Sequence, residues 1–307
     1  MSQRQALDGL AVGLMVLITL IWGLQQVFVK AVAEDMSPIL QIALRSGIAG
    51  GLLALVMLVR REALMSRETL LPGLVAGVLF ALEFFFVGEG LKHTTASHMI
   101  VFLYSAPVFV ALSLHFSVEG EQLSSIQWFG IMTAFSGIAL TFLWRADTGG
   151  EQASDMLWGD LLALLAALSW GATTVLIRRT SLSNAPAMQT LFYQLSLCFI
   201  ILLTTAALTS QTSFNATTPV LANLAFQGLV VSFGSLFAWF WMLRRYPASQ
   251  LGVFTFLTPI FGIVFGVWLL GEPLEPSFIA GAVLVMSGIM LVNSHEKIAQ
   301  RLRMLRD

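Results

Sequence analysis

Apolar runs of about 20 residues recur along the whole chain, and short breaks rich in proline, glycine, asparagine or charged residues separate them. A helix of that length crosses the roughly 30 Å of hydrocarbon in a bilayer, so each run predicts one transmembrane helix. The predicted helices cover residues 10–31, 38–59, 70–91, 95–117, 125–144, 156–178, 186–208, 220–243, 248–270 and 276–293. The longest breaks are Arg145–Asp155 and Thr209–Pro219, and neither has room for a soluble domain. The pattern therefore predicts an all-α membrane protein with ten transmembrane helices.

The second half of the chain repeats features of the first half in the same order. The matched positions are Trp22-Gly23 with Trp170-Gly171, Pro38 and Gln41 with Pro186 and Gln189, Ala96-Ser97 and Pro107 with Ala248-Ser249 and Pro259, Gly120-Glu121 with Gly271-Glu272, and Gly130 and Gly137 with Gly281 and Gly288. Because each copy has five helices, an odd number, the second copy must enter the membrane from the opposite side. Such inverted repeats are typical of secondary transporters, since two similar halves of opposite orientation can open a central site to either side in turn. We predict one repeat over residues 1–145, a second over 156–294 and a basic cytoplasmic tail over 295–307.

Composition agrees with a bilayer as the solvent. The chain is 57% hydrophobic and only 11% charged, with a mean hydropathy of +0.83, whereas a soluble domain is about 25% charged. A net charge of −1 gives no reason to expect nucleic acid as a partner. The single cysteine, Cys198, excludes an internal disulfide and a thiolate metal cluster. We predict neither a metal nor a cofactor.

Basic residues are distributed unevenly between alternate breaks. If the N-terminus lies inside, the inner segments contain most of the 16 lysine and arginine residues. These are Arg4, Arg60, Arg61, Arg67, Arg178, Arg179, Arg244, Arg245, Lys297, Arg301, Arg303 and Arg306. Basic breaks stay on the cytoplasmic side of a membrane. We therefore predict that both termini are cytoplasmic and that the Arg145–Asp155 break is external.

The doubled motifs resemble those of the drug/metabolite transporter superfamily, EamA type. They are Trp-Gly in the first helix of each repeat, Ala-Ser with a following proline in the fourth, and Gly-Glu at the end of the fourth. Over the whole chain the resemblance is greatest to the YddG-type bacterial exporters of aromatic and other neutral amino acids. It implies a monomeric ten-helix basket with a central cavity, exporting amino acids across the bacterial inner membrane without ATP. In the first repeat the Gly-Glu motif is embedded in Glu119-Gly120-Glu121, so we assign it no role beyond closing the loop.

Two ionisable residues lie deep in predicted helices. Arg45 is about 10 Å from the outer end of the second helix and Glu83 about 12 Å from the outer end of the third. Buried charges in a membrane face a partner or a cavity. Two interpretations follow: the residues form an ion pair that joins the helices, or they line the cavity and bind the carboxylate and amino groups of a zwitterion.

Aromatic and polar residues share faces on several predicted helices and suit a pocket for apolar or aromatic amino acids. The candidate substrate-binding residues are Trp22, Gln26, Arg45, Glu83, His98, Tyr104, Trp170, Tyr193, Trp239 and Phe254. His98 is either a pH-sensitive site or a hydrogen-bonded histidine near the membrane surface. Pro107 and Pro259 occupy matching mid-helix positions, where a proline kinks its helix, and are candidate gates.

Other functions fit the sequence less well. An intramembrane enzyme needs a nucleophile and a base at the same depth, but His93, His98, His115 and His295 lie toward helix ends or in loops. The chain has no Walker motif to drive a pump and no ring of charge for a channel. A carrier of phosphorylated sugars would need several buried cations, and only Arg45 qualifies. The alternatives to amino-acid export are export of another small metabolite or drug and, from a different class, an intramembrane enzyme.

Overall fold

A computed structural model describes residues 8–117, 122–148, 150–246, 251–252 and 254–304. Its helices are α1 (Gly9–Ala31), α2 (Pro38–Val59), α3 (Leu70–His93), α4 (Ala96–Leu103), α5 (Ala106–Ser117), α6 (Ser125–Thr148), α7 (Glu151–Arg179), α8 (Ala187–Leu208), α9 (Thr218–Ala225), α10 (Leu236–Arg245), α12 (Leu257–Leu270) and α13 (Pro276–Met304). A short 3-10 helix, η1 (Ser181–Ser183), and a π-helix, η2 (Phe226–Ser235), complete the fold. Within these ranges the chain forms no strand, and one isolated bridge joins Met36 to Phe214.

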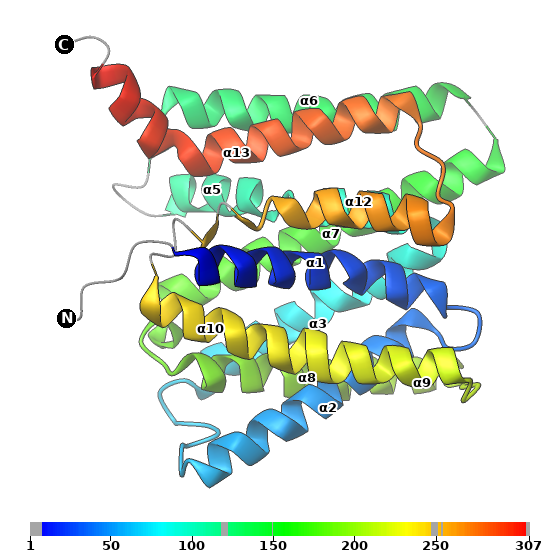
Figure 1. Cartoon of the computed structure of the whole chain (residues 1–307), viewed down its shortest axis with the longest axis vertical. Coiled ribbons are helices and arrows are strands. Elements are labelled where there is room, and N and C mark those ends of the chain that lie inside the picture. Colours follow the sequence, from blue (N-terminus) through cyan, green and yellow to red (C-terminus); the bar gives the residue numbers. More distant parts are fainter. Residues whose placement is uncertain (1–7, 118–121, 149, 247–250, 253, 305–307) are drawn as a thin grey trace.

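The predicted all-α membrane fold is confirmed. Nine helical segments in the described ranges are long and apolar enough to cross a bilayer, and Leu257–Leu270 is a shorter apolar helix. That short helix is the second half of the predicted helix 248–270, whose first half includes residues outside the described ranges. The protein is therefore a multi-pass membrane protein, and its helices run side by side through the whole molecule (Figure 1).

Local sequence signals set several helix ends. Asp8 caps α1 by accepting a hydrogen bond from the backbone N–H of Ala11, and Ser37 caps α2 through Leu40. At the end of α12, Gly271 adopts a left-handed conformation with a φ of 65°, which a glycine tolerates without strain. This turn directs the next residue, Glu272, back toward the bundle.

The two matched prolines coincide with breaks in their helices. The span 96–116 divides at Tyr104 and Ser105 into α4 and α5, and α12 begins at Leu257 after two turn residues. Each break lies within one turn before the proline, where proline has no N–H to donate to the carbonyl four residues earlier. The prediction that Pro107 and Pro259 interrupt their helices is therefore confirmed, while their role as gates stays a prediction.

Two groups of helices face each other across the middle of the molecule. The α1 bundle consists of α1, η2, α10 and α12, and the α3 bundle consists of α3, α4, α5 and α7. Two further pairs flank them: α2 with α8, and α6 with α13, which lie side by side along one edge (Figure 1). We call the end where α1 begins and α10 ends the Asp8 end, and the end where α1 and α12 end and α4 begins the Glu272 end.

Several boundaries differ from the prediction. The Arg145–Asp155 break is shorter than predicted, because α6 continues to Thr148 and α7 begins at Glu151. The predicted tail over 295–307 is helical as far as Met304, as a continuation of α13. The Glu119–Glu121 motif of the first repeat and Ala248-Ser249 of the second lie outside the described residues.

Candidate functional site

A cavity of about 420 Å³ lies between the α1 bundle and the α3 bundle. Its polar and aromatic lining includes Trp22, Gln25, Gln26, Ser232, Trp239 and Thr255 from the α1 side, Glu83, Phe84, Tyr104, Trp170, Thr173 and Thr174 from the α3 side, and Arg45, Ser46 and Gln194 from α2 and α8. The cavity is of the size that small-molecule sites usually have. It is the natural candidate for a solute site because residues from both bundles line it.

Two aromatic pairs form opposite walls of the cavity. Trp22 meets Trp239 edge to face, with ring centroids 5.7 Å apart, and Tyr104 meets Trp170 in the same way at 5.4 Å. The indole N–H of Trp22 donates to the Ser235 hydroxyl at 2.9 Å, which fixes the ring. Edge-to-face pairs stabilise one another beyond the area they bury. The two walls are therefore ordered apolar surfaces that can hold a planar or aliphatic group between them.

Arg45 supplies a buried cation at the α2 side of the cavity. The residue is 3% exposed, and its guanidinium lies 4.5 Å from the centroid of the Phe84 ring. Nη1 donates to Gln227 at 2.9 Å, and Gln25, with its amide oxygen turned toward the guanidinium, accepts from Nη1 at 2.9 Å and from Nη2 at 3.2 Å. These neutral amides orient the guanidinium without neutralising its charge, and they leave a donor on Nη2.

Glu83 supplies a buried carboxyl group to the same cavity from the middle of α3. The residue is 6% exposed, and within the described ranges no donor or cation lies at hydrogen-bonding or ion-pair distance from its carboxylate. The first interpretation, an ion pair between Arg45 and Glu83, is therefore not what the structure contains. Equal depth along two helices does not make their side chains point at each other, and Arg45 turns toward Gln227 instead. Both residues line the cavity, while binding of a zwitterion by them stays a prediction.

A second hollow of about 820 Å³ continues from the cavity toward the Asp8 end. The two spaces share Pro107, Trp170, Thr174, Trp239, Thr255 and Asn293. The second hollow also reaches Arg178, near the last residue of α7, and Gln127, near the start of α6. The two bundles are therefore separated at the Asp8 end, and the cavity communicates with that end of the molecule.

The two bundles meet at the Glu272 end. Glu272, just after α12, accepts hydrogen bonds from the backbone N–H groups of Ala96 at 2.6 Å and Ser97 at 3.0 Å, and from the Ser97 hydroxyl at 2.6 Å. Lys30, in the last turn of α1, donates to the carbonyls of Leu91 and Thr94 at the end of α3. A carboxylate at a helix N-terminus and an ammonium at a helix C-terminus both complement the helix dipole. These contacts hold the two bundles together at the Glu272 end.

Some predicted site residues lie outside the cavity. His98 is buried beside it, with Nδ1 3.0 Å from Asp160 and its ring stacked on Phe278 at 3.9 Å, so it has the hydrogen-bonded environment of the second interpretation. The Tyr193 hydroxyl lies 3.2 Å from that of Thr69 and faces away from the cavity. Phe254 packs in the cluster around Trp22 and Trp239, behind the lining, and Pro259 is buried in α12.

The remaining predicted residues come together in the cavity. These are Trp22, Gln26, Arg45, Glu83, Tyr104, Trp170, Trp239 and Pro107. Sequence reasoning missed Gln25 and Gln194, each adjacent to a residue that it selected. One position along a helix rotates the side chain by about 100°, so a small error in phase replaces one neighbour with the other.

Two buried carboxylates with structural partners were also missed. Asp160 is fully buried and accepts a hydrogen bond from the Thr94 hydroxyl. Its position inside an apolar run of the sixth predicted helix was the available signal, because a charge at that depth needs a partner. Glu272 was seen as part of a repeated motif, but the sequence does not reveal its bonds to residues 175 and 176 positions earlier.

The model of the EamA-like transporter family matches the chain twice, over residues 9–143 and over residues 157–294. The two matched segments each contain five of the predicted helices. The internal duplication seen in the sequence is therefore a duplication of one family unit.

Similar proteins are transporters and efflux pumps by name. Transporter YoaV of Bacillus subtilis is 26% identical over 283 residues, which cover 89% of this chain and 93% of that protein. The probable amino-acid metabolite efflux pump of Escherichia coli is 28% identical over 290 residues, which cover 91% and 93%. One solved crystal structure has a TM-score of 0.66 at 18% identity and covers 96% of this chain and 99% of its own, which shows a shared fold.

Proposed function

The chain belongs to the EamA-like transporter family, and on that premise we propose that it exports aromatic and other neutral amino acids across the bacterial inner membrane by alternating access. The observation that carries this proposal is the composition of the cavity. One space holds a cation, Arg45, a carboxyl group, Glu83, and two aromatic walls. A neutral amino acid has the matching set of groups: a carboxylate, an ammonium and a side chain.

Each group of the substrate has a defined partner in the proposal. Arg45 binds the carboxylate, since a guanidinium donates paired N–H groups to carboxylates. Glu83 binds the ammonium, and the walls formed by Trp22 with Trp239 and by Tyr104 with Trp170 hold the side chain. A pocket walled by rings discriminates a missing methylene by only about 1–3 kcal/mol, so the selectivity for side chains is broad.

Alternating access requires an inverted relation between the halves 1–145 and 156–294, and one contact between corresponding helices supports it. Corresponding glycines meet where α6 packs on α13: Gly130 lies against Gly288 and Gly137 against Gly281. The order of these contacts means that the two corresponding helices run in opposite directions. Two halves of opposite orientation place their shared site near the middle of the membrane, where either side can reach it. The breaks before Pro107 and Pro259 give each half a point about which to bend.

Charge gives the proposed orientation. The Asp8 end contains Arg60, Arg61, Arg178, Arg179 and Arg245, and basic residues mark the cytoplasmic side. In this assignment both termini are cytoplasmic, the protein works as a monomer, and the structure is open to the cytoplasm. An exporter takes up its substrate in that state.

Purified protein in proteoliposomes tests the proposal. Vesicles loaded with unlabelled amino acid should exchange it for labelled phenylalanine, tryptophan or leucine added outside, and empty vesicles or vesicles with an irrelevant membrane protein should not. Failure to exchange any amino acid, combined with exchange of another small metabolite or a drug, would replace the substrate class. The aromatic walls favour this second candidate function, export of another small metabolite or a drug, because they would hold any flat apolar solute.

A further inference from the structure

Among the residues that the structure describes, the carboxyl group of Glu83 has no partner inside the proposed substrate cavity. The other carboxylates near the bundle interface are occupied: Glu272 accepts three hydrogen bonds, and Asp160 accepts from Thr94 and contacts His98. The Glu83 carboxylate has no comparable contact among the described residues. An ionised carboxylate out of water needs either a proton or a cation beside it.

The groups around Glu83 provide neither. Arg45 on α2 is the nearby cation, but it lies beyond ion-pair distance, and its guanidinium is held by Gln25 and Gln227. The other titratable groups close enough to feel the charge of Glu83 are Tyr104, between α4 and α5, and Cys198 on α8. In the described lining, α1 and α7 contribute amides, hydroxyls and indoles on this side of the cavity. The partner of Glu83 must therefore enter from outside.

We propose that Glu83 binds a proton and the ammonium group of the substrate in turn, so that the protein exchanges protons for amino acids. This inference rests on the proposed function and adds the coupling ion to it. When an amino acid enters, the carboxylic acid of Glu83 releases its proton to water in the hollow, and the carboxylate then pairs with the ammonium. When the amino acid leaves on the other side, a proton from that side takes its place.

Exchange follows from the cost of the empty state. With a proton or with an ammonium, Glu83 itself is neutralised and the cavity can close around it. Arg45 keeps its bonds to Gln25 and Gln227 and its position over the Phe84 ring in each of these states. With neither, closing the cavity would enclose an unpaired carboxylate, which is strongly unfavourable in a medium of low dielectric constant. The protein therefore changes conformation only when Glu83 is occupied, and each net outward passage of substrate is matched by an inward passage of a proton.

Proton release on binding tests the inference directly. Phenylalanine is added to purified protein in a weakly buffered detergent solution. A pH indicator reports the released protons, and a scintillation proximity assay with labelled phenylalanine reports binding. The wild type should release close to one proton per bound amino acid at acidic pH, and its affinity should weaken about tenfold for each pH unit there. Glu83→Gln should release none, and Glu83→Asp should still release a proton.

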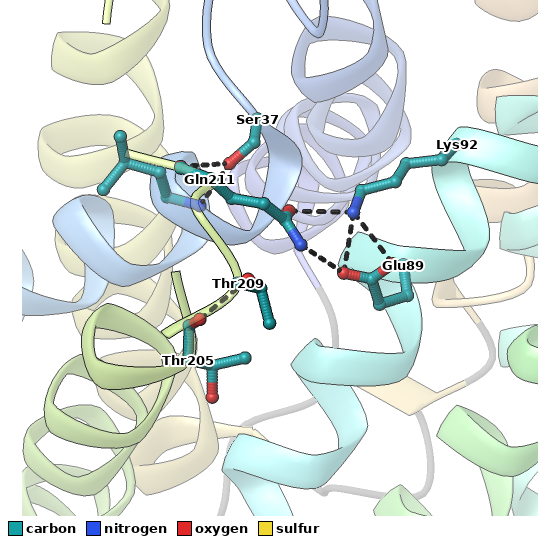
Figure 2. A network of polar contacts seen from close by, with 7 residues as sticks. Ser37, Glu89, Lys92, Thr205, Thr209 and Gln211 are labelled. Carbon is teal, nitrogen blue, oxygen red and sulfur yellow. Dashed lines mark hydrogen bonds and ion pairs between the residues drawn. The ribbon is translucent and has the colours of Figure 1, made fainter. Parts of the chain in front are cut away.

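Glu89→Gln is the matched control. Glu89 lies on the same helix as Glu83, but at the Glu272 end, where it is bonded to Lys92 and Gln211 outside the cavity (Figure 2). This variant should release protons as the wild type does. Binding by the wild type without proton release, at every pH between about 5 and about 9, would overturn the inference and leave amino-acid export standing. Absence of any amino-acid binding would overturn the proposed function and the inference together.

Discussion

The carboxylate of Glu272 lies 2.6 Å from the hydroxyl of Ser97. Glu272 follows the last helix of the α1 bundle, and Ser97 is in the first turn of α4 in the α3 bundle. Gly266 makes this meeting feasible, since a Cβ at that position would collide with both side chains. The contact joins the two bundles at one end of the cavity, while the opposite end is hollow. In an alternating-access cycle it must break whenever the Glu272 end opens.

Loss of the Glu272 carboxylate should therefore favour the state that is open at the Glu272 end. Glu272→Ala removes three hydrogen bonds, two of them from the N-terminus of α4, and each charge-assisted bond contributes about 1.5–3 kcal/mol. With Ser232→Cys in a Cys198→Ser background, a membrane-impermeant maleimide added at the outer side should label the cavity faster in the Glu272→Ala variant. Glu89→Gln, at the same end, should leave labelling unchanged. Equal labelling rates in all three proteins would show that this contact is not a gate.

The tryptophans of the two walls should decide transport of aromatic substrates. Trp22→Ala and Trp170→Ala each remove one ring from an edge-to-face pair that lines the cavity. We expect the transport rate for phenylalanine and tryptophan to fall at least about tenfold, which corresponds to roughly 1.4 kcal/mol. The transport rate for alanine should fall less. The amount of folded protein, measured by gel filtration, should change much less.

Trp268 provides the comparison for this experiment. It lies on α12 with 75% of its surface exposed, away from the cavity. Trp268→Ala should transport at the wild-type rate. If the wall variants also transport every amino acid normally, the rings serve packing and the substrate binds elsewhere.

Arg45 should recognise the carboxylate of the substrate. Arg45→Gln keeps a polar side chain near Gln25 and Gln227 but removes the positive charge. Amino acids should lose at least about tenfold in affinity, while the corresponding amino-acid amides, which have no carboxylate, should lose little. The ratio of the two affinities is the measurement, and it is independent of how much protein folds. Equal losses for acids and amides would assign Arg45 a structural role.

The sequence predicted the helices and their breaks because those features depend on local chemistry. Length and apolarity define a membrane-spanning helix, and a proline removes a backbone donor wherever it stands. The matched prolines, Pro107 and Pro259, therefore predict two breaks from residue type and position alone. The π-helix η2 has no such local signal. Gln227 within it is fully buried and bonded to Arg45, a contact between distant helices that no local pattern reveals.

Partners between distant helices were the part that sequence reasoning could not give. Arg45 and Glu83 were placed at similar depth, which was enough to bring both to the cavity, but their rotation about the helix axes was unknown. Arg45 is bonded to Gln227, 182 residues away, and Glu272 to Ala96, 176 residues away. Such pairings depend on how the helices pack in three dimensions and have no local signature.

Labelling at the turn between α6 and α7 should establish the orientation. The turn lies at the Glu272 end, because α6 begins near the hollow at the Asp8 end and α7 passes Thr94 near its start. In a Cys198→Ser background, Gly150→Cys should react with an impermeant maleimide added outside intact cells. Labelling only after the cells are opened would reverse the proposed topology, and with it the assignment of the open end to the cytoplasm.

Asp8 should make the stability of the protein depend on pH in the acidic range. Its carboxylate accepts a hydrogen bond from the Ala11 backbone N–H at 2.8 Å and from the Tyr246 hydroxyl at 3.0 Å. The Ala11 bond, and with it the Tyr246 bond, lowers the pKa of Asp8 below its ordinary value. A lowered folded-state pKa means that Asp8 stabilises the fold fully above its unfolded pKa of about 4, and that this stabilisation is lost as the pH falls through the folded value.

Asp8→Asn can still cap the helix but does not titrate. The Tm of the wild type should therefore exceed that of Asp8→Asn near neutral pH, and the two should converge in acid. A Tm difference that stays constant as the pH is lowered through this range would show that the charge of Asp8 does not contribute.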